Sequence, residues 1–362
     1  MAGAQPGENV YAQVDRVRRA LGRQLDALGL GPLETPARLV LAEPCLSLKA
    51  YETAPGTEAA ILLVPAPIKR AYLWDLAPWA SVVRRCLAGG LGVYVLQWEQ
   101  PGERERGLGL ADYADRLILA CVEAMRAETG HPSVVLAGHS LGGTLAALFA
   151  ALHPERAQGL ILLGAPLRFS PRVGVLGLVV AASPSVRALT AGLGNVPGSL
   201  LDAVCWLVDP LTFGWLRWVD GMTSLSDPEA LWTYLLVERW TLDELALPQR
   251  LFEELVEWLY REDRFMGGTL ELGARPVAPR QVTAPLLSVV DRRCSIAPPE
   301  SVLPFHDAVR SRVKDLLWYE GDRGVSMQHV GMLVGRNAHR WLWPAIIRWI
   351  HVRARRTVIP SG

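Results

Sequence analysis

The stretch that decides the fold reads Val134-Val-Leu-Ala-Gly138-His139-Ser140-Leu141-Gly142-Gly143-Thr144. A short apolar run ends in the pattern Gly-x-Ser-x-Gly, and a helical pattern begins directly after it. A serine on such a turn adopts strained backbone angles, and its hydroxyl projects from the carboxyl end of the strand. The glycines allow strand and helix to approach closely. We therefore predict that Ser140 is a nucleophile and that the Leu141 N–H helps to bind an oxyanion.

Apolar runs and helical patterns alternate on both sides of this stretch. The expected strands before and around it cover residues 60–64, 93–96, 134–137 and 160–163, with helices near 79–87, 112–128 and from 143. The alternation returns in runs at 285–290 and 315–319 and in a final helix at 337–352. Continuous apolar strands separated by helices are typical of a parallel sheet that is covered on both faces. The fold class is therefore α/β.

The interruption between the two series predicts an inserted cap. We expect an N-terminal helix in residues 1–35, core in 36–168, a helical cap in 169–277 and the second part of the core in 278–362. The N-terminal helix carries an apolar stripe that begins at Val10 and ends before Gly29. The cap is rich in tryptophan, so it would close over an apolar substrate, bury a dimer interface or contact a membrane.

Composition excludes several classes of protein. The chain has 37 Lys+Arg and 36 Asp+Glu, a net charge of +1, so it lacks the basic excess of a nucleic-acid-binding protein. Its five cysteines contain no Cys-x-x-Cys pair, which argues against a disulfide framework or a zinc site. The longest uncharged stretch, 173–186, is shorter than the roughly 18 residues of a membrane span and contains Pro184. We expect a cytoplasmic protein with no secretory signal, metal or cofactor.

A serine nucleophile needs a base, and His329 is the candidate. In folds with this turn the chain order is serine, acid, histidine, so the base should follow the last strand. Three other late histidines, His306, His339 and His351, fall within helical patterns. His329 follows the run at 315–319, and we expect it on a loop.

The acid of the site is less well defined by the sequence. Asp291 is the one carboxylate directly after the run at 285–290, where an orienting acid would lie. It would orient the base or pair with Arg292 or Arg293 at the strand end. Cys294 follows closely and would be a small loop residue, a second nucleophile or a redox centre.

A second oxyanion donor is expected on the loop after residues 60–64. The loop reads Pro65-Ala-Pro-Ile-Lys-Arg70, and its prolines have no N–H to donate. That leaves the Ile68 N–H as the expected donor, with Ala66 as the alternative. Lys69 would be either a solvated charge or a contact for an anionic group of the substrate.

Five segments together resemble the polyhydroxyalkanoate synthases, and most closely the class III type. They are Val64–Leu76, Gly92–Trp98, the Ser140 turn, Glu238-Arg-Trp-Thr-Leu-Asp243, and the pair Gln281–Pro285 with Gln328-His-Val-Gly331. The resemblance implies an α/β-hydrolase fold with a mobile cap, and acyl chemistry on hydroxyacyl thioesters. Acyl-CoA would be a substrate, and the protein would work near polymer granules, as a homodimer or with a partner synthase subunit.

Two positions depart from the pattern of that family. Its nucleophile is a cysteine, and Ser140 stands there in this chain; its orienting aspartate aligns with Cys294 when counted back from Pro298-Pro299. Three functions stay open: a serine acyl-transfer enzyme, an esterase- or lipase-type hydrolase, and a weakly active member that binds polymer or a partner synthase subunit.

Overall fold

A computed structural model describes residues 10–52, 59–170, 173, 177, 180–183 and 185–354. Pro184, residues 1–9 and residues 355–362 lie outside the described part, so the predictions that concern them are not developed further.

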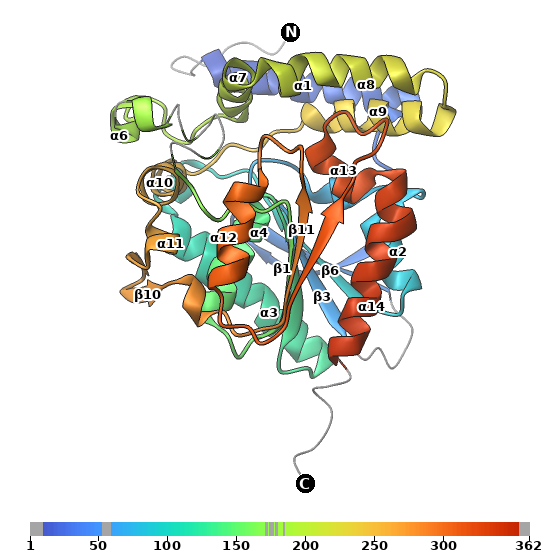
Figure 1. Ribbon diagram of the computed structural model, residues 1–362. Coiled ribbons are helices and arrows are strands. Elements are labelled where there is room, and N and C mark those ends of the chain that lie inside the picture. The colour runs from blue at the N-terminus through green and yellow to red at the C-terminus, as the bar shows by residue number, and fades with distance from the viewer. Residues whose placement is uncertain are drawn as a thin grey trace.

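One mixed sheet of eight strands forms the centre of the molecule, in the order β1-β2-β6-β3-β7-β8-β11-β12 (Figure 1). Its strands are β1 (Ala37–Glu43), β2 (Leu46–Tyr51), β3 (Ala60–Val64), β6 (Gly92–Trp98), β7 (Val134–His139), β8 (Ala157–Leu163), β11 (Leu286–Asp291) and β12 (Lys314–Tyr319). The six strands from β6 to β12 are parallel to one another, and β1 and β2 pair in antiparallel fashion at one edge. Two small sheets pair β4 (Asp75–Ala77) with β5 (Ala80–Ser81) and β9 (Leu270–Leu272) with β10 (Arg275–Val277).

Helices cover both faces of the sheet. The α-helices are α1 (Val10–Leu25), α2 (Val82–Ala88), α3 (Leu117–Thr129), α4 (Leu141–Leu152), α6 (Val186–Thr190), α7 (Gly198–Val208), α8 (Arg217–Ser224), α9 (Pro228–Thr241), α10 (Gln249–Glu254), α11 (Arg264–Gly267), α12 (Pro299–Ala308), α13 (Gln328–Val334) and α14 (Trp343–Ala354). Segments of 3₁₀- or π-helix are η1 (Asp26–Leu30), η2 (Ala71–Trp74), η3 (Glu103–Gly107), η4 (Asp112–Arg116), η5 (Leu211–Leu216), η6 (Leu255–Arg261), η7 (Pro279–Gln281) and η8 (Ala338–Leu342).

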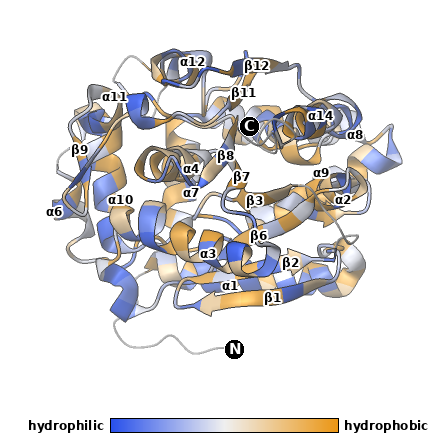
Figure 2. Ribbon diagram, turned by 90° about the horizontal axis from the view of Figure 1, so that it is seen from below, coloured by the Kyte–Doolittle hydropathy of each residue, from blue (hydrophilic) through white to orange (hydrophobic). Residues whose placement is uncertain are grey.

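The core lies on both sides of the sheet because the central strands are apolar throughout. Every residue of β3 is buried, and its side chains enter one cluster with α3 and α4 and another with α2 and α14. Figure 2, in which the ribbons are coloured by hydropathy, shows these strands largely in orange between the helices. Two buried faces per strand explain the unbroken apolar runs that predicted this sheet.

The six predicted strands and the helices between them are confirmed, with boundaries shifted by a few residues. The prediction did not include β1, which is largely exposed, or β2, nor did it include α12 and α13. One expectation is wrong: His329 lies within the first turn of α13, not on a loop.

The elements between β8 and β11 divide into two groups. Helices α7, α8 and α9 lie with α1 above the carboxyl ends of the strands (Figure 1). From Leu245 onward the chain returns to the core, since Leu251, Leu259 and Phe265 pack in the same cluster as α3 and α4. The helices above the sheet are therefore the part of this segment that can cover a site at the strand ends.

Helix α1 is amphipathic as predicted, but its apolar stripe faces outward. Val10, Val14, Val17 and Leu21 are 70%, 40%, 68% and 46% exposed. The opposite side is held by polar contacts, because the Asp15 carboxylate accepts hydrogen bonds from the N–H groups of Gly198 and Ser199 at the start of α7. Neighbouring helices add further exposed apolar side chains: Trp206, Leu207, Leu211, Trp215, Trp218 and Met222.

Within the described residues, no single helix has both the length and the apolar character needed to cross a membrane. Residues Gly198–Val208 and Leu211–Ser224 pass that test only when taken together, and they are bent by 105° at the break between them.

Candidate active site

Ser140 occupies the sharp turn between β7 and α4. Its backbone angles are φ 55° and ψ −132°, a region that a residue with a side chain rarely adopts. The Ser140 N–H donates to the Leu163 carbonyl, and its own carbonyl accepts from Gly143 and Thr144. The turn is thus fixed to β8 on one side and to α4 on the other, and the serine stands at the carboxyl end of the central strands.

Close backbone contacts explain the glycines of this turn. A Cβ at Gly138 would meet the backbone of Gly143, and one at Gly142 would meet the Val64 carbonyl and Pro65. No side chain fits at either position, and the two glycines therefore allow α4 to begin directly beside the end of β3. The Leu141 N–H belongs to the first turn of α4 and has no partner within the helix, so it is free to bind a ligand oxygen.

The loop after β3 runs beside this helix start. The Trp98 indole N–H donates to the Pro65 carbonyl at 2.8 Å, and the Ile68 carbonyl accepts from the Leu245 N–H at 3.0 Å. The first bond ties the loop that carries the predicted Ile68 donor to the sheet. The second ties the same loop to the segment after α9. Ala66 accepts a long 3.5 Å bond from the Lys69 N–H through its carbonyl.

Lys69 is not the solvated charge that was one of the two roles considered for it. Its ammonium donates to the Glu244 carboxylate at 2.6 Å and to the Thr241 carbonyl at 2.9 Å. Arg18 of α1 reaches the same carboxylate at 3.1 Å. The Glu244 side chain is 4% exposed, and burial raises the pKa of its carboxyl group. Lys69 therefore joins the loop after β3 to the cap and to α1.

His329 is buried within the first turn of α13, beside a second histidine. The His139 Nε2 lies 2.8 Å from the His329 carbonyl oxygen, and the two ring centroids are 4.6 Å apart. A carbonyl only accepts, so the His139 Nε2 carries the proton. Burial lowers the pKa of His139 to about 4, and burial together with His139 lowers the pKa of His329 well below its usual value. Both imidazoles are thus neutral at pH 7.

The partner of the His329 ring is Cys294. The Cys294 Sγ lies 3.3 Å from the His329 Nδ1, whereas the His329 Nε2 makes no hydrogen bond within the described residues. The expected hydrogen bond from His329 to Asp291 is not made. One carboxylate oxygen of Asp291 accepts the Arg293 N–H at 2.8 Å, and the other has no partner among the described residues. Asp291 closes the turn after β11, and that turn presents the thiol to the histidine.

The cap holds the segment that leads into α13. The Asp220 carboxylate of α8 accepts hydrogen bonds from the Gly324 and Ser326 N–H groups at 3.0 and 2.8 Å. The Ser326 hydroxyl donates to Glu238 of α9 at 2.5 Å. Ser326 has a φ of 62°, so these contacts maintain a strained turn three residues before His329.

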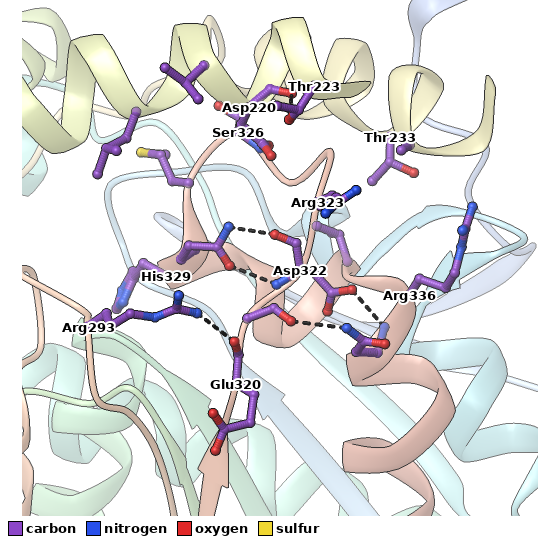
Figure 3. A pocket seen from close by; sticks show the side chains of 18 of the residues that line it. Asp220, Thr223, Thr233, Arg293, Glu320, Asp322, Arg323, Ser326, His329 and Arg336 are labelled. Carbon is purple, nitrogen blue, oxygen red and sulfur yellow. Dashed lines mark hydrogen bonds between the residues drawn. The ribbon is translucent and has the colours of Figure 1, made fainter. Parts of the chain in front are cut away.

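A cavity of about 870 Å³ lies between this segment and the cap. Figure 3 shows His329 and Arg293 on one side of it and Asp220 and Thr223 on the cap side. Cys294 and Ile296 also line it. The cavity is large enough for a small acyl ligand, and it reaches the imidazole and thiol of the candidate site.

Within the described part of the chain, no group of three or more His, Cys, Asp or Glu side chains is arranged to hold a metal ion.

Ser140 and His329 were predicted from the sequence, whereas the contacts that His139 and Cys294 make with His329 were not. His139 adjoins the serine in the sequence, yet its support of the His329 backbone depends on a contact across 190 residues. Cys294 was identified only as the residue at the position of the family's orienting aspartate; its contact with the ring was not predicted, since a thiol is an unusual partner for an imidazole.

The parallel sheet and the strained serine at the carboxyl end of β7 define a protein of the α/β-hydrolase class. A family model described as alpha/beta hydrolase fold matches residues 61–176. The chain is 32% identical over 352 residues to the poly(3-hydroxyalkanoate) polymerase subunit PhaC of Haloferax mediterranei, covering 96% of this chain and 70% of that protein. It is 26% identical to the PhaC subunit of Allochromatium vinosum, covering 88% of this chain and 89% of that subunit.

The chain belongs to the poly(3-hydroxyalkanoate) polymerase PhaC family, and it is an enzyme of the acyltransferase or hydrolase kind. Solved structures agree on the fold. A monoacylglycerol lipase from Paleococcus ferrophilus aligns with a TM-score of 0.52 at 18% identity, covering 85% of this chain and 99% of the lipase. A monoglyceride lipase from Saccharomyces cerevisiae aligns with a TM-score of 0.54 at 11% identity, covering 89% and 98% of the two chains.

Proposed function

We propose that the protein is a serine acyltransferase of the class III synthase type, which acts on hydroxyacyl thioesters or esters through an acyl group on Ser140. The strained Ser140 turn, with a free N–H on Leu141, is the observation that carries this proposal. In this chain the serine takes the place of the cysteine used by the synthases, and serine chemistry requires a base within reach.

The reaction divides into two steps. In the first, the His329 Nε2 accepts the proton of Ser140 while the hydroxyl oxygen attacks the substrate carbonyl. The N–H groups of Leu141 and Ile68 bind the oxyanion, and the thiol or alcohol leaves with the proton held by His329. In the second step the proton of an attacking acceptor passes to His329, the bond between the acyl group and the Ser140 oxygen breaks, and His329 returns the proton to that oxygen. This assignment is supported by the neutral state of His329 and by its Nε2, which makes no hydrogen bond within the described residues, to Ser140 or to any other, and so keeps its lone pair for the serine proton.

The acceptor decides between polymer synthesis and hydrolysis. A hydroxyl group of a growing chain as acceptor gives a polymerase, and water gives an esterase- or lipase-type hydrolase. The relatives named as polymerases favour the first acceptor. Exclusion of water under the cap would be the physical basis of that preference.

The test is to incubate the purified protein with 3-hydroxybutyryl-CoA and, separately, with a p-nitrophenyl ester. Release of CoA with polymer supports the transferase, and release of CoA with free acid supports the hydrolase. Ser140→Ala should abolish turnover of both substrates. Unchanged turnover in that variant would exclude the mechanism.

A second candidate function is binding without efficient turnover, to polymer or to a partner synthase subunit. The exposed apolar side chains on α1 and α7 favour it, because monomeric proteins rarely leave so many together in water. The same face would serve a homodimer. Fluorophosphonate labelling distinguishes an active from an inactive site: rapid labelling of Ser140 that is lost in His329→Ala excludes an inactive protein.

A further inference from the structure

Two contacts fix the position of the Cys294 sulfur. The Cys294 Sγ lies 3.3 Å from the His329 Nδ1, and it also accepts the Ala297 N–H at 3.3 Å. The residue is 6% exposed and follows the turn that Asp291 closes. The thiol therefore has one position, fixed by backbone on its own side and facing the imidazole on the other.

The direction of this hydrogen bond determines which nitrogen of His329 can act as a base. If the Nδ1–H donates to sulfur, the Nε2 keeps its lone pair and can accept the serine proton. If the S–H donated to Nδ1, the proton of the neutral ring would be on Nε2, and the ring could not accept the proton of Ser140. Sulfur already accepts one N–H bond from Ala297, which favours its use as an acceptor for the second.

Other groups around the imidazole do not supply this function. Gly164 lies against the ring edge and brings no polar side chain. His139 bonds to the backbone carbonyl of His329, not to its ring. The Asp291 carboxylate makes no hydrogen bond to the ring.

We propose that Cys294 is the positioning residue of the site: its sulfur accepts the Nδ1–H of His329 and thereby keeps Nε2 unprotonated toward Ser140. The inference rests on the proposed role of His329 as base. A thiol in this place fixes the tautomer of the ring as a carboxylate does, but it brings no charge to stabilise the imidazolium that forms during the reaction.

The difference between thiol and carboxylate gives the proposal its test. Cys294→Ala removes the acceptor, and we expect kcat for a p-nitrophenyl ester to fall about tenfold or more with little change in KM, because base catalysis contributes 10² to 10⁴ in rate. Cys294→Asp is made together with Asp291→Asn, so that two buried carboxylates do not face each other. In that double variant the pKa of His329 rises, and the acid limb of the rate profile moves to higher pH.

Asp291→Asn alone is the matched control, because an amide oxygen still accepts the Arg293 N–H. The acid limb of its rate profile should stay where it lies in the unaltered protein, because burial and His139, not Asp291, lower the pKa of His329; any shift in the double variant then belongs to Cys294→Asp. Circular dichroism and thermal unfolding check that each variant is folded. A folded Cys294→Ala protein with unchanged kcat, or a double variant whose acid limb stays in place, overturns the proposal.

Nitrogen NMR of the unaltered protein tests the same point without any variant of Cys294. The His329 signals, assigned by their loss in His329→Gln, should show a protonated Nδ1 and an unprotonated Nε2. The opposite tautomer overturns the role of Cys294. Failure of the proposed function looks different, since Ser140→Ala would then retain activity whatever the state of the Cys294 contact.

Discussion

Replacement of Gly164 by alanine should damage catalysis more than it damages folding. Gly164 follows β8 with a φ of +51°, and its N–H donates to the Val289 carbonyl at 2.9 Å. A Cβ at this position would lie 3.2 Å from the Cε1 and 3.3 Å from the Nδ1 of His329. Both distances are tighter than ordinary contacts, and Cys294 lies against the same nitrogen. The ring must therefore shift by a few tenths of an ångström.

Gly164→Ala should change both the free energy of folding and kcat. An alanine in the left-handed region costs roughly 1–2 kcal/mol of folding free energy. Displacement of a catalytic group by 1 Å costs up to a hundredfold in rate, so a smaller shift of His329 should lower kcat by about tenfold. KM should change little, since the substituted residue touches the base and not the cavity.

Gly273→Ala is the matched control for this experiment. Gly273 has a φ of +56° in the turn between β9 and β10, and a Cβ there would meet nothing within 4 Å. Denaturant unfolding should show a similar loss of stability in both variants, while ester hydrolysis should fall only in Gly164→Ala. Full activity in Gly164→Ala, or an equal loss in Gly273→Ala, would refute the placement of His329 as the base.

Three further predictions concern the base and the contacts that join the cap to the core. Because the pKa of His329 is depressed and the base must be neutral, kcat/KM should persist as pH falls through 6.5 and decline only well below it; a half-maximum at 6.5 or above contradicts the buried imidazole. Asp220→Asn replaces one acceptor of the Gly324 and Ser326 N–H groups with a donor, and should cost about 1–3 kcal/mol in unfolding experiments and also lower kcat. A stability loss with an unchanged kcat would show that the cap does not position the base. Lys69→Met leaves the buried Glu244 with one cation, and should lower stability by about 1–3 kcal/mol; no change in the unfolding midpoint would mean that the pair is not needed.

Local patterns were enough to predict the sheet. The runs at β3, β7 and β8 are apolar throughout because both of their faces are buried, so their strands could be read without knowledge of their neighbours. Strand β1 is exposed along much of its length, and its apolar run covers only residues 39–42 of its seven. The outward stripe of α1 shows a further limit: the spacing predicts an amphipathic helix, but the contacts of Asp15 decide which side faces the protein.

Two residues of the candidate site were predicted from single positions: Ser140 from a pattern whose glycines have a steric cause, and His329 from chain order. The partner of His329 was not predictable in the same way. Asp291 has the right chemistry but lies three residues before Cys294. Counting back from Pro298-Pro299 pointed to Cys294, but only the turn after β11 shows that its sulfur contacts the His329 ring.

The most direct test of the account is to find the acyl group itself. The protein is mixed with 3-hydroxybutyryl-CoA, quenched in acid within one turnover and digested for mass spectrometry. We predict one hydroxybutyryl group on the peptide that contains Ser140, and none in Ser140→Ala. Release of CoA without an adduct on Ser140, or an adduct on Cys294 instead, would contradict the central claim that Ser140 is the nucleophile.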